Sequence, residues 1–151
     1  MENYRDSISL LKQTNFSKTI WWKLKVNIPG YQNQTEDKLV TEIFKNRIFK
    51  LLYANINQNT HKCSRVLVQL YEDGYVCWIN LEGLIIEKCE LRKTENSKNE
   101  YFLIKEKVPS ILKWIKNQAA IKNEYLWGGT LGPNFDCSGL IQTAFFKHHI
   151  Y

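Results

Sequence analysis

The segment formed by residues 125–140, YLWGGTLGPNFDCSGL, constrains the fold of this chain more than any other stretch. It contains a Gly-Gly pair and a Gly-Pro-Asn turn signal, which exclude regular structure before residue 136. An apolar run with helical spacing comes next, formed by Leu140, Ile141, Ala144 and Phe145. Asp136 is a good N-cap residue, so we expect the chain to enter a helix from a turn with Cys137 in its first turn.

A cysteine in that position has a chemical consequence. The free amide groups and the positive dipole end of a helix N-terminus favour the ionised thiolate, which is the nucleophilic form. A protonated histidine near the thiol would favour it further. The alternative is a buried cysteine that acts as a small apolar side chain, as most cysteines do. The whole context of residues 125–140 favours the nucleophile.

Two parts of this segment, Tyr125-Leu-Trp-Gly-Gly129 and Phe135-Asp-Cys-Ser-Gly-Leu140, resemble the nucleophile motif of the NlpC-type peptidases. These are papain-like cysteine enzymes that cut the stem peptides of bacterial peptidoglycan. The resemblance implies that Cys137 attacks the scissile carbonyl. It also implies that Tyr125 shapes the oxyanion site together with the backbone amide of Cys137.

The Gly132-Pro-Asn134 version of the motif is most similar to one subgroup, the γ-D-glutamyl-L-diamino-acid endopeptidases with an N-terminal bacterial SH3-like barrel. In that subgroup the residues that match Asp136 and Ser138 hold the free amine of an N-terminal L-Ala. The implied partner is a peptidoglycan-derived peptide, and no cofactor is implied.

Upstream, residues 20–86 contain short apolar segments separated by turn signals, which predict a small antiparallel barrel. The expected strands are 21–28, 38–43, 48–53, 64–71 and 75–79. The expected turns and loops are Pro29-Gly30, a polar loop at 55–60, Glu72-Asp-Gly74 and a helical turn at 81–84. The Gly74-x-x-x-Trp78 stretch resembles the closing strand of bacterial SH3-like barrels. In the subgroup named above the barrel walls off one end of the catalytic groove, and Asp73 and Tyr75 are the candidates for that contact. Their alternative roles are turn residue and barrel surface.

The sequence therefore predicts an α+β fold in four parts. They are an N-terminal arm (1–19), a small antiparallel SH3-like β-barrel (20–86), a linker (87–106), and the helical front part of a papain-like NlpC-type catalytic domain (107–151). The helix expected at 107–120 has Pro109 in its first turn. Its apolar face is expected to consist of Val108, Ile111, Leu112, Ile115 and Ala119.

A cysteine peptidase also needs a base, and the resemblance implies a histidine on a strand after the nucleophile helix. Tyr151 ends the chain 14 residues after Cys137. A continuing helix would place His148 about 16 Å from Cys137, whereas a base must reach within about 3 Å. His149 is next to His148 and is equally far from Cys137, and His61 falls in a predicted loop.

The apolar run after Cys137 must cover the barrel and the preceding helix, meet a partner, or belong to a longer protein. We favour the last, and we expect a shortened, inactive enzyme.

The composition argues against several other classes of protein. The net charge is +6, but Lys and Arg are mixed with acids, which indicates a solvated surface rather than a nucleic-acid groove. No stretch approaches the roughly 20 apolar residues of a membrane span. The N-terminus is polar and acidic, so we expect no secretory segment and a cytoplasmic location. The four cysteines form no Cys-x-x-Cys pair, so neither a zinc site nor a disulfide framework is expected.

Two functions follow. The first, implied by the resemblance, is a thiol peptidase that cleaves γ-D-Glu–diamino acid bonds in peptides with a free N-terminal L-Ala. The alternative is a non-catalytic SH3-like module that binds cell-wall peptides or another protein. A nucleic-acid-binding function would instead predict a steep loss of affinity with salt.

Overall fold

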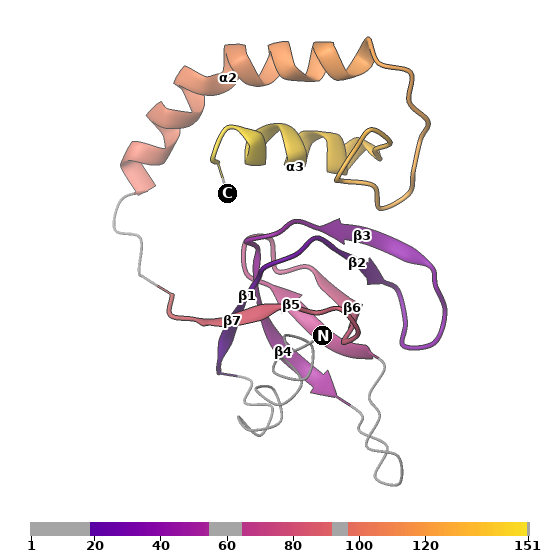
Figure 1. The fold of residues 1–151 in the computed structure, drawn as a ribbon. Coiled ribbons are helices and arrows are strands. Elements are labelled where there is room, and N and C mark those ends of the chain that lie inside the picture. The colour runs from indigo at the N-terminus through magenta and orange to yellow at the C-terminus, as the bar shows by residue number, and fades with distance from the viewer. Residues whose placement is uncertain (1–18, 55–64, 92–96, 151) are drawn as a thin grey trace, which may run out of the picture. The chain divides into compact units, whose positions relative to one another are not determined.

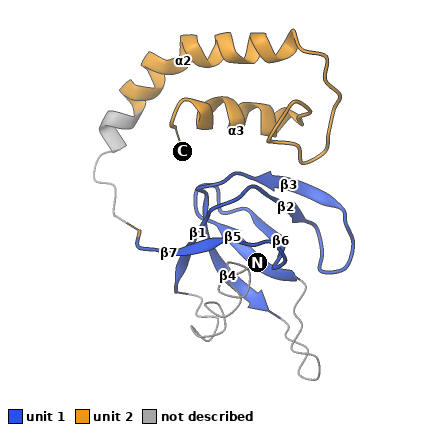
Figure 2. Ribbon diagram, viewed as in Figure 1, with its two compact units in different colours: residues 1–90 blue, residues 91–151 orange. Residues whose placement is uncertain are grey.

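The computed structural model describes residues 19–54, 65–91 and 97–150, with side chains within α2 described from Tyr101 onward. Most of the predicted arm, the loop at 55–60 and His61 lie outside the described residues. The chain divides into two compact units, residues 1–90 and residues 91–151 (Figure 2).

Within its described residues, unit 1 is a seven-stranded antiparallel sheet with the order β3-β2-β6-β5-β4-β1-β7 (Figure 1). The strands are β1 Trp21–Leu24, β2 Ile28–Tyr31, β3 Leu39–Ile43, β4 Ile48–Ala54, β5 Arg65–Leu70, β6 Val76–Asn80 and β7 Ile86–Cys89. The predicted antiparallel sheet is confirmed. The predicted closed barrel is not, because among the described residues β3 and β7 are unpaired edges of an open sheet.

One face of the sheet forms the core of unit 1. Alternate residues of the strands are buried, which is the period expected of a sheet with one solvated face. Trp22 and Phe49 are the largest buried side chains and face each other across the β1–β4 pair. The other members of the core are Leu24, Ile28, Ile43, Leu51, Val66, Val68, Leu70, Cys77, Ile79, Leu81 and Leu84.

The stretch predicted as one strand at 21–28 is divided in the structure between β1 and β2, and Pro29-Gly30 lies inside β2 rather than in a turn. Pro29 is tolerated because it faces only Glu42 of β3, while the pairing of β2 with β6 begins at Gly30. Gly30 is required for packing rather than for turning. A Cβ atom there would lie 2.8 Å from Cγ2 of Thr41 and 2.9 Å from Sγ of Cys77.

The predicted turns around the last strands are confirmed. The backbone N–H of Leu70 donates to the Tyr75 carbonyl at 2.8 Å, and Gly74 adopts a φ of +68° between them. At the second turn the N–H of Leu84 donates to the Leu81 carbonyl at 3.2 Å.

The predicted linker is wrong at both ends. Ile86–Cys89 forms β7, which pairs with β1, and α2 spans Ser97–Ala119, so it begins well before residue 107. β7 is an edge strand with two exposed central residues, and it therefore shows no alternation for a sequence pattern to detect.

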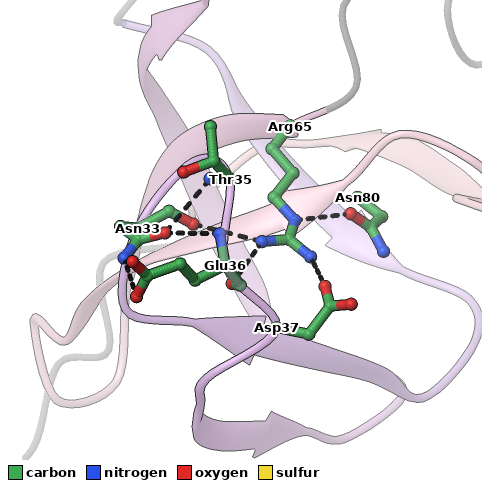
Figure 3. Close-up of polar contacts among 6 residues, drawn as sticks. All are labelled: Asn33, Thr35, Glu36, Asp37, Arg65 and Asn80. Carbon is green, nitrogen blue, oxygen red and sulfur yellow. Dashed lines mark hydrogen bonds and ion pairs between the residues drawn. The ribbon is translucent and has the colours of Figure 1, made fainter.

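A buried arginine holds the loop between β2 and β3 (Figure 3). Arg65 is 5% exposed, and its Nε donates to Oδ1 of Asn80 at 2.8 Å. Its Nη1 donates to the Glu36 carbonyl at 2.6 Å. The guanidinium also contacts the Asn33 carbonyl, the Asp37 carboxylate and the ring of Tyr31. This single side chain satisfies polar groups from β6 and from three residues of the loop.

Unit 2 consists of α2 and α3, joined by the irregular segment 120–136; α3 spans Cys137–Lys147. The helices run antiparallel (Figure 1). Nζ of Lys107 donates to the His148 carbonyl at 2.6 Å, and the rings of Trp114 and Phe135 pack edge to face at 6.1 Å. In the described part of the chain, neither helix is both long enough and apolar enough to span a membrane.

The predicted apolar face of α2 is corrected. Ile111 is buried and Ile115 half-buried, but Val108 and Ala119 are exposed and Leu112 is 51% exposed. The packed face instead follows Ile104, Lys107, Ile111, Trp114, Ile115 and Gln118. Apolar residues occur on both sides of this helix, so their spacing alone does not identify the buried side. Pro109 lies inside the helix rather than in its first turn, and Figure 1 shows the helix bending along its length.

Candidate functional site

Cys137 is the first residue of α3 and its side chain is exposed, as the sequence predicts. Asp136 is the N-cap, with an extended backbone (φ −90°, ψ 176°). Its Oδ1 accepts a hydrogen bond from the backbone N–H of Gly139 at 2.6 Å. This bond satisfies one of the free amides of the first turn and fixes where the helix begins.

The Asp136 carboxylate organises the residues on both sides of Cys137. Its Oδ1 also accepts from Oγ of Ser138 at 2.8 Å, and its Oδ2 accepts from the N–H of Gly128 at 2.9 Å. Burial by itself would raise the pKa of Asp136, but the hydrogen bonds from Gly139, Ser138 and Gly128 together lower it below its ordinary value. Asp136 is therefore a carboxylate at neutral pH.

The glycine-rich entry packs directly against α3. A Cβ atom on Gly139 would lie 1.9 Å from the Gly129 carbonyl oxygen, so only glycine fits at that helical position. Gly128 adopts a φ of +75°, which glycine reaches at no steric cost. The Thr143 hydroxyl donates to the Thr130 carbonyl, which ties the end of this entry to the middle of the helix.

A short parallel bridge to Phe135 brings Tyr125 beside the segment that leads into Cys137. The N–H of Leu126 donates to the Phe135 carbonyl at 3.2 Å, and the N–H of Glu124 donates to Oδ1 of Asn134 at 2.9 Å. The Tyr125 side chain is 67% exposed. Asn134 is therefore a positioning residue that the sequence analysis missed. Its position directly after Gly-Pro could have indicated this role, because an Asn side chain in a turn commonly forms hydrogen bonds with nearby backbone groups.

These residues share an open pocket of about 350 Å³ in unit 2. Its lining comes from the end of α2, the bridge segments and the start of α3, namely Gln118, Ala119, Asn123, Glu124, Tyr125, Phe135, Asp136, Cys137 and Leu140. An exposed thiol, a phenol and a carboxylate thus border one solvent-accessible space. Such a pocket can hold a peptide beside the thiol.

The other two predicted site residues, Asp73 and Tyr75, lie in unit 1. Oδ2 of Asp73 accepts from Nη2 of Arg47 at 2.8 Å, and its Oδ1 accepts from the N–H of Tyr75 at 3.0 Å. The Tyr75 side chain is exposed. The turn role is therefore real for Asp73, and a role for either residue in a catalytic groove stays a prediction.

Both histidines in the described residues lie at the far end of α3. His148 is the C-cap, with Nδ1 2.7 Å from the Ala144 carbonyl, and His149 follows it. An eleven-residue helix is about 16 Å long, so neither imidazole reaches the thiol along it. Both histidines thus lie at the end of α3 away from Cys137, where the sequence analysis placed them.

The other described thiols differ in character. Burial raises the pKa of the Cys77 thiol to about 12, so it stays protonated inside the sheet. Cys89 is half-buried on the edge strand β7. Across residues 19–54, 65–91 and 97–150 no three His, Cys, Asp or Glu side chains are grouped so that they could hold a metal ion.

Comparison with known proteins finds a family match for part of the chain. Residues 122–151 match the NlpC/P60 family, and these residues include Tyr125, Asp136, Cys137 and Ser138. No curated protein sequence matches the chain. Among solved structures, NlpC2 from Trichomonas vaginalis is similar at 16% identity with a TM-score of 0.33. The similarity covers 83% of this chain, which spans 40% of the length of that protein.

Proposed function

We propose that residues 122–151 supply the nucleophile of a cysteine peptidase that acts on cell-wall peptides. The observation that carries the proposal is the place of Cys137, exposed at the first turn of α3 and lining one pocket with Tyr125 and Asp136. The match of these residues to the NlpC/P60 family supports it.

In the proposed reaction the thiolate of Cys137 attacks the carbonyl carbon of the substrate. A sulfur–carbon bond forms, the carbon–nitrogen bond breaks, and the amine leaves with a proton. Water then hydrolyses the thioester. The backbone N–H of Cys137 and the hydroxyl of Tyr125 stabilise the oxyanion that forms on the carbonyl oxygen. The base that moves the proton comes from outside the described residues of this chain.

The proposed substrate is a peptide released from peptidoglycan, cleaved between γ-D-Glu and a diamino acid. Its free N-terminal amine is held by Asp136, with Ser138 beside it. The support is chemical: Asp136 is ionised, lines the pocket next to the thiol, and a carboxylate pairs strongly with an ammonium. Capping of α3 by the same carboxylate is compatible with this role.

A covalent probe tests the proposal without requiring turnover. L-Ala-γ-D-glutamyl acyloxymethyl ketone carries the proposed recognition group; a thioether forms with the thiol and a carboxylate leaves. We expect one label per chain, located on Cys137 by peptide mass spectrometry. Labelling should be lost in Cys137→Ala and kept in Cys89→Ala, and N-acetylation of the probe should slow it. Labelling of Cys89 instead, or equal labelling by a probe of unrelated sequence, would contradict the proposal.

The second candidate function is a non-catalytic peptide-binding module. It is favoured by one observation, that both described histidines lie at the far end of α3 from Cys137. Hydrolysis of L-Ala-γ-D-Glu-diaminopimelate separates the two candidates. Cleavage that disappears in Cys137→Ala excludes a purely binding role. Binding without cleavage, unchanged in Cys137→Ala and without probe labelling, excludes the peptidase.

A further inference from the structure

Several large apolar side chains of α2 are exposed to solvent. The exposed fractions are 65% for Tyr101, 69% for Phe102, 42% for Leu103, 38% for Val108 and 51% for Leu112. Single exposed apolar side chains are common on protein surfaces and need no explanation. A group of them on one helix forms a patch, and such patches mark surfaces that bind another molecule.

Four of these side chains lie on one side of α2. Successive residues of an α-helix are about 100° apart, which places Tyr101, Val108 and Leu112 in one line along the helix and Phe102 beside them. We call these four residues the apolar stripe. It lies roughly 100° around the helix axis from Ile111, which is buried on the side that packs within unit 2. The stripe is therefore a second apolar side of α2, apart from the packed one.

The apolar stripe is bordered by lysines. Lys105, Lys113 and Lys116 are exposed, and their positions on the helix fall between or beside those of the stripe. No described carboxylate forms an ion pair with any of the three. Among the described side chains of α2 the one acid is Glu106. We call these three residues the lysine border, and they make this side of the helix positively charged.

A second copy of this chain fits the surface poorly. Two stripes in contact would bring the lysine borders of both copies together, with Glu106 of each copy as the one nearby acid on the described part of α2. Like charges held close together repel and destabilise the contact. The charge instead favours a negatively charged partner.

An anionic lipid surface matches both parts of this side of α2. Helices that bind such surfaces bury an apolar stripe at the boundary between headgroups and acyl chains, and their lysines reach the lipid phosphates. A lysine can do so while its stem stays on apolar surface, because the side chain is long. Over its described residues α2 is not apolar enough to cross a bilayer, so the fitting contact is with the membrane surface.

We propose that unit 2 binds an anionic membrane surface through the apolar stripe and the lysine border of α2. The inference goes beyond the proposed function, because this surface contains none of the residues that line the Cys137 pocket. Leu112, the last residue of the stripe, lies about 9 Å along the helix before Gln118 at the pocket. Membrane binding and the chemistry of Cys137 can therefore be tested separately.

Vesicle flotation of the full chain tests the proposal. One set of vesicles is phosphatidylcholine alone, and the other is an equal mixture of phosphatidylcholine and phosphatidylglycerol. We expect binding to the anionic vesicles and little binding to the neutral ones. The binding should weaken as salt is added, because exposed charges are screened.

A first variant removes the lysine border. We expect at least about tenfold weaker binding to the anionic vesicles, since each lysine near such a surface strengthens binding about fivefold. This variant is Lys105→Gln/Lys113→Gln/Lys116→Gln. The matched control removes the same charge from exposed positions of unit 1 and should change binding less than about twofold. It is Lys38→Gln/Lys45→Gln/Lys88→Gln.

A second variant, Phe102→Gln/Leu112→Gln, makes the apolar stripe polar. It should also weaken binding about tenfold or more, because less apolar surface leaves water on the membrane. Its matched control is Tyr53→Gln/Val76→Gln, at exposed positions of unit 1, which should bind as the unaltered chain does. All these substitutions are at exposed positions, and circular dichroism checks that helix content is retained.

Absence of binding to the anionic vesicles would overturn the proposal. Equal losses in the α2 variants and the unit 1 controls would also overturn it, because they would reflect net charge alone. If the chain self-associates without vesicles and Phe102→Gln/Leu112→Gln abolishes this, the stripe is an interface between two copies and the proposal is wrong. In each of these cases, labelling of Cys137 by the L-Ala-γ-D-glutamyl probe still decides the proposed function.

Discussion

Gly139 in the first turn of α3 meets the carbonyl oxygen of Gly129 so closely that a Cβ atom would lie 1.9 Å from it. The contact joins two parts of one motif that are ten residues apart. It explains why a glycine occupies a helical position, where glycine ordinarily costs about 1 kcal/mol relative to alanine. The close approach holds the glycine-rich entry against the helix that begins with Cys137.

Gly139→Ala should therefore loosen the segment around Cys137. We expect α3 to lose about 3 kcal/mol of stability, since the added methyl meets backbone that cannot move aside cheaply. Hydrogen exchange of the α3 amides measures this directly. Gln142→Ala, at an exposed position of the same helix, is the control and should leave exchange nearly unchanged. Equal protection in the two variants would show that the entry does not depend on this contact.

The pH dependence of α3 should reflect Asp136. Its pKa in the folded chain lies below the ordinary value of 3.8, so its ionised form stabilises the fold. That contribution is fully present above pH 3.8 and is lost as the pH falls through the lower folded pKa. Asp136→Asn keeps an acceptor for Gly139 but removes the charge. We expect wild type to exceed Asp136→Asn in α3 protection at pH 6 and the difference to shrink toward pH 3. A difference that grows on acidification would contradict this assignment.

Tyr125→Phe tests the oxyanion role. Loss of a hydrogen-bond donor to an oxyanion lowers rates by about 100-fold or more in established cases. Tyr125 is 67% exposed, so we expect a smaller effect: the rate at which the L-Ala-γ-D-glutamyl acyloxymethyl ketone labels Cys137 should fall about tenfold, with binding of the probe little changed. Tyr101→Phe, at an exposed tyrosine on α2, is the matched control. A full rate in Tyr125→Phe would remove Tyr125 from the reaction.

The Arg65 cluster predicts an asymmetric pair of variants. Arg65→Ala leaves the Asn80 side chain and the Glu36 carbonyl without their donor, and we expect it to destabilise unit 1 by about 2–3 kcal/mol. Asp37→Ala removes only a partner whose side chain is 85% exposed, so it should cost under about 1 kcal/mol. Urea unfolding measures both. Similar losses in the two variants would mean that the ion pair, rather than the buried hydrogen bonds, stabilises the loop.

The local chemistry of the candidate site could be predicted from the sequence because its signals are local. Asp136 is an N-cap residue followed by an apolar helical run, and this alone places Cys137 in a first turn. Asn134 was missed because its bond to Glu124 spans ten residues through a turn whose shape no propensity describes.

The fold was less predictable where burial is weak. The residues of β7 do not alternate between buried and exposed because it is a half-exposed edge strand, and the sequence analysis therefore assigned it to a linker. On α2, apolar residues such as Leu112 face solvent while Lys107 packs on the inner side with its amine on the His148 carbonyl. A count of apolar positions does not identify the buried face of such a helix, because long side chains can bury their stems while their polar ends stay hydrogen-bonded.

Site-resolved alkylation tests the central claim most directly. Native chain is treated with iodoacetamide, and the modification of Cys137 and Cys77 is followed over time by peptide mass spectrometry. We predict that Cys137 reacts readily, that Cys77 reacts only after unfolding, and that L-Ala-γ-D-Glu-diaminopimelate slows the reaction of Cys137. A Cys137 thiol as resistant as Cys77, or one that the peptide does not protect, would contradict a nucleophile at this pocket.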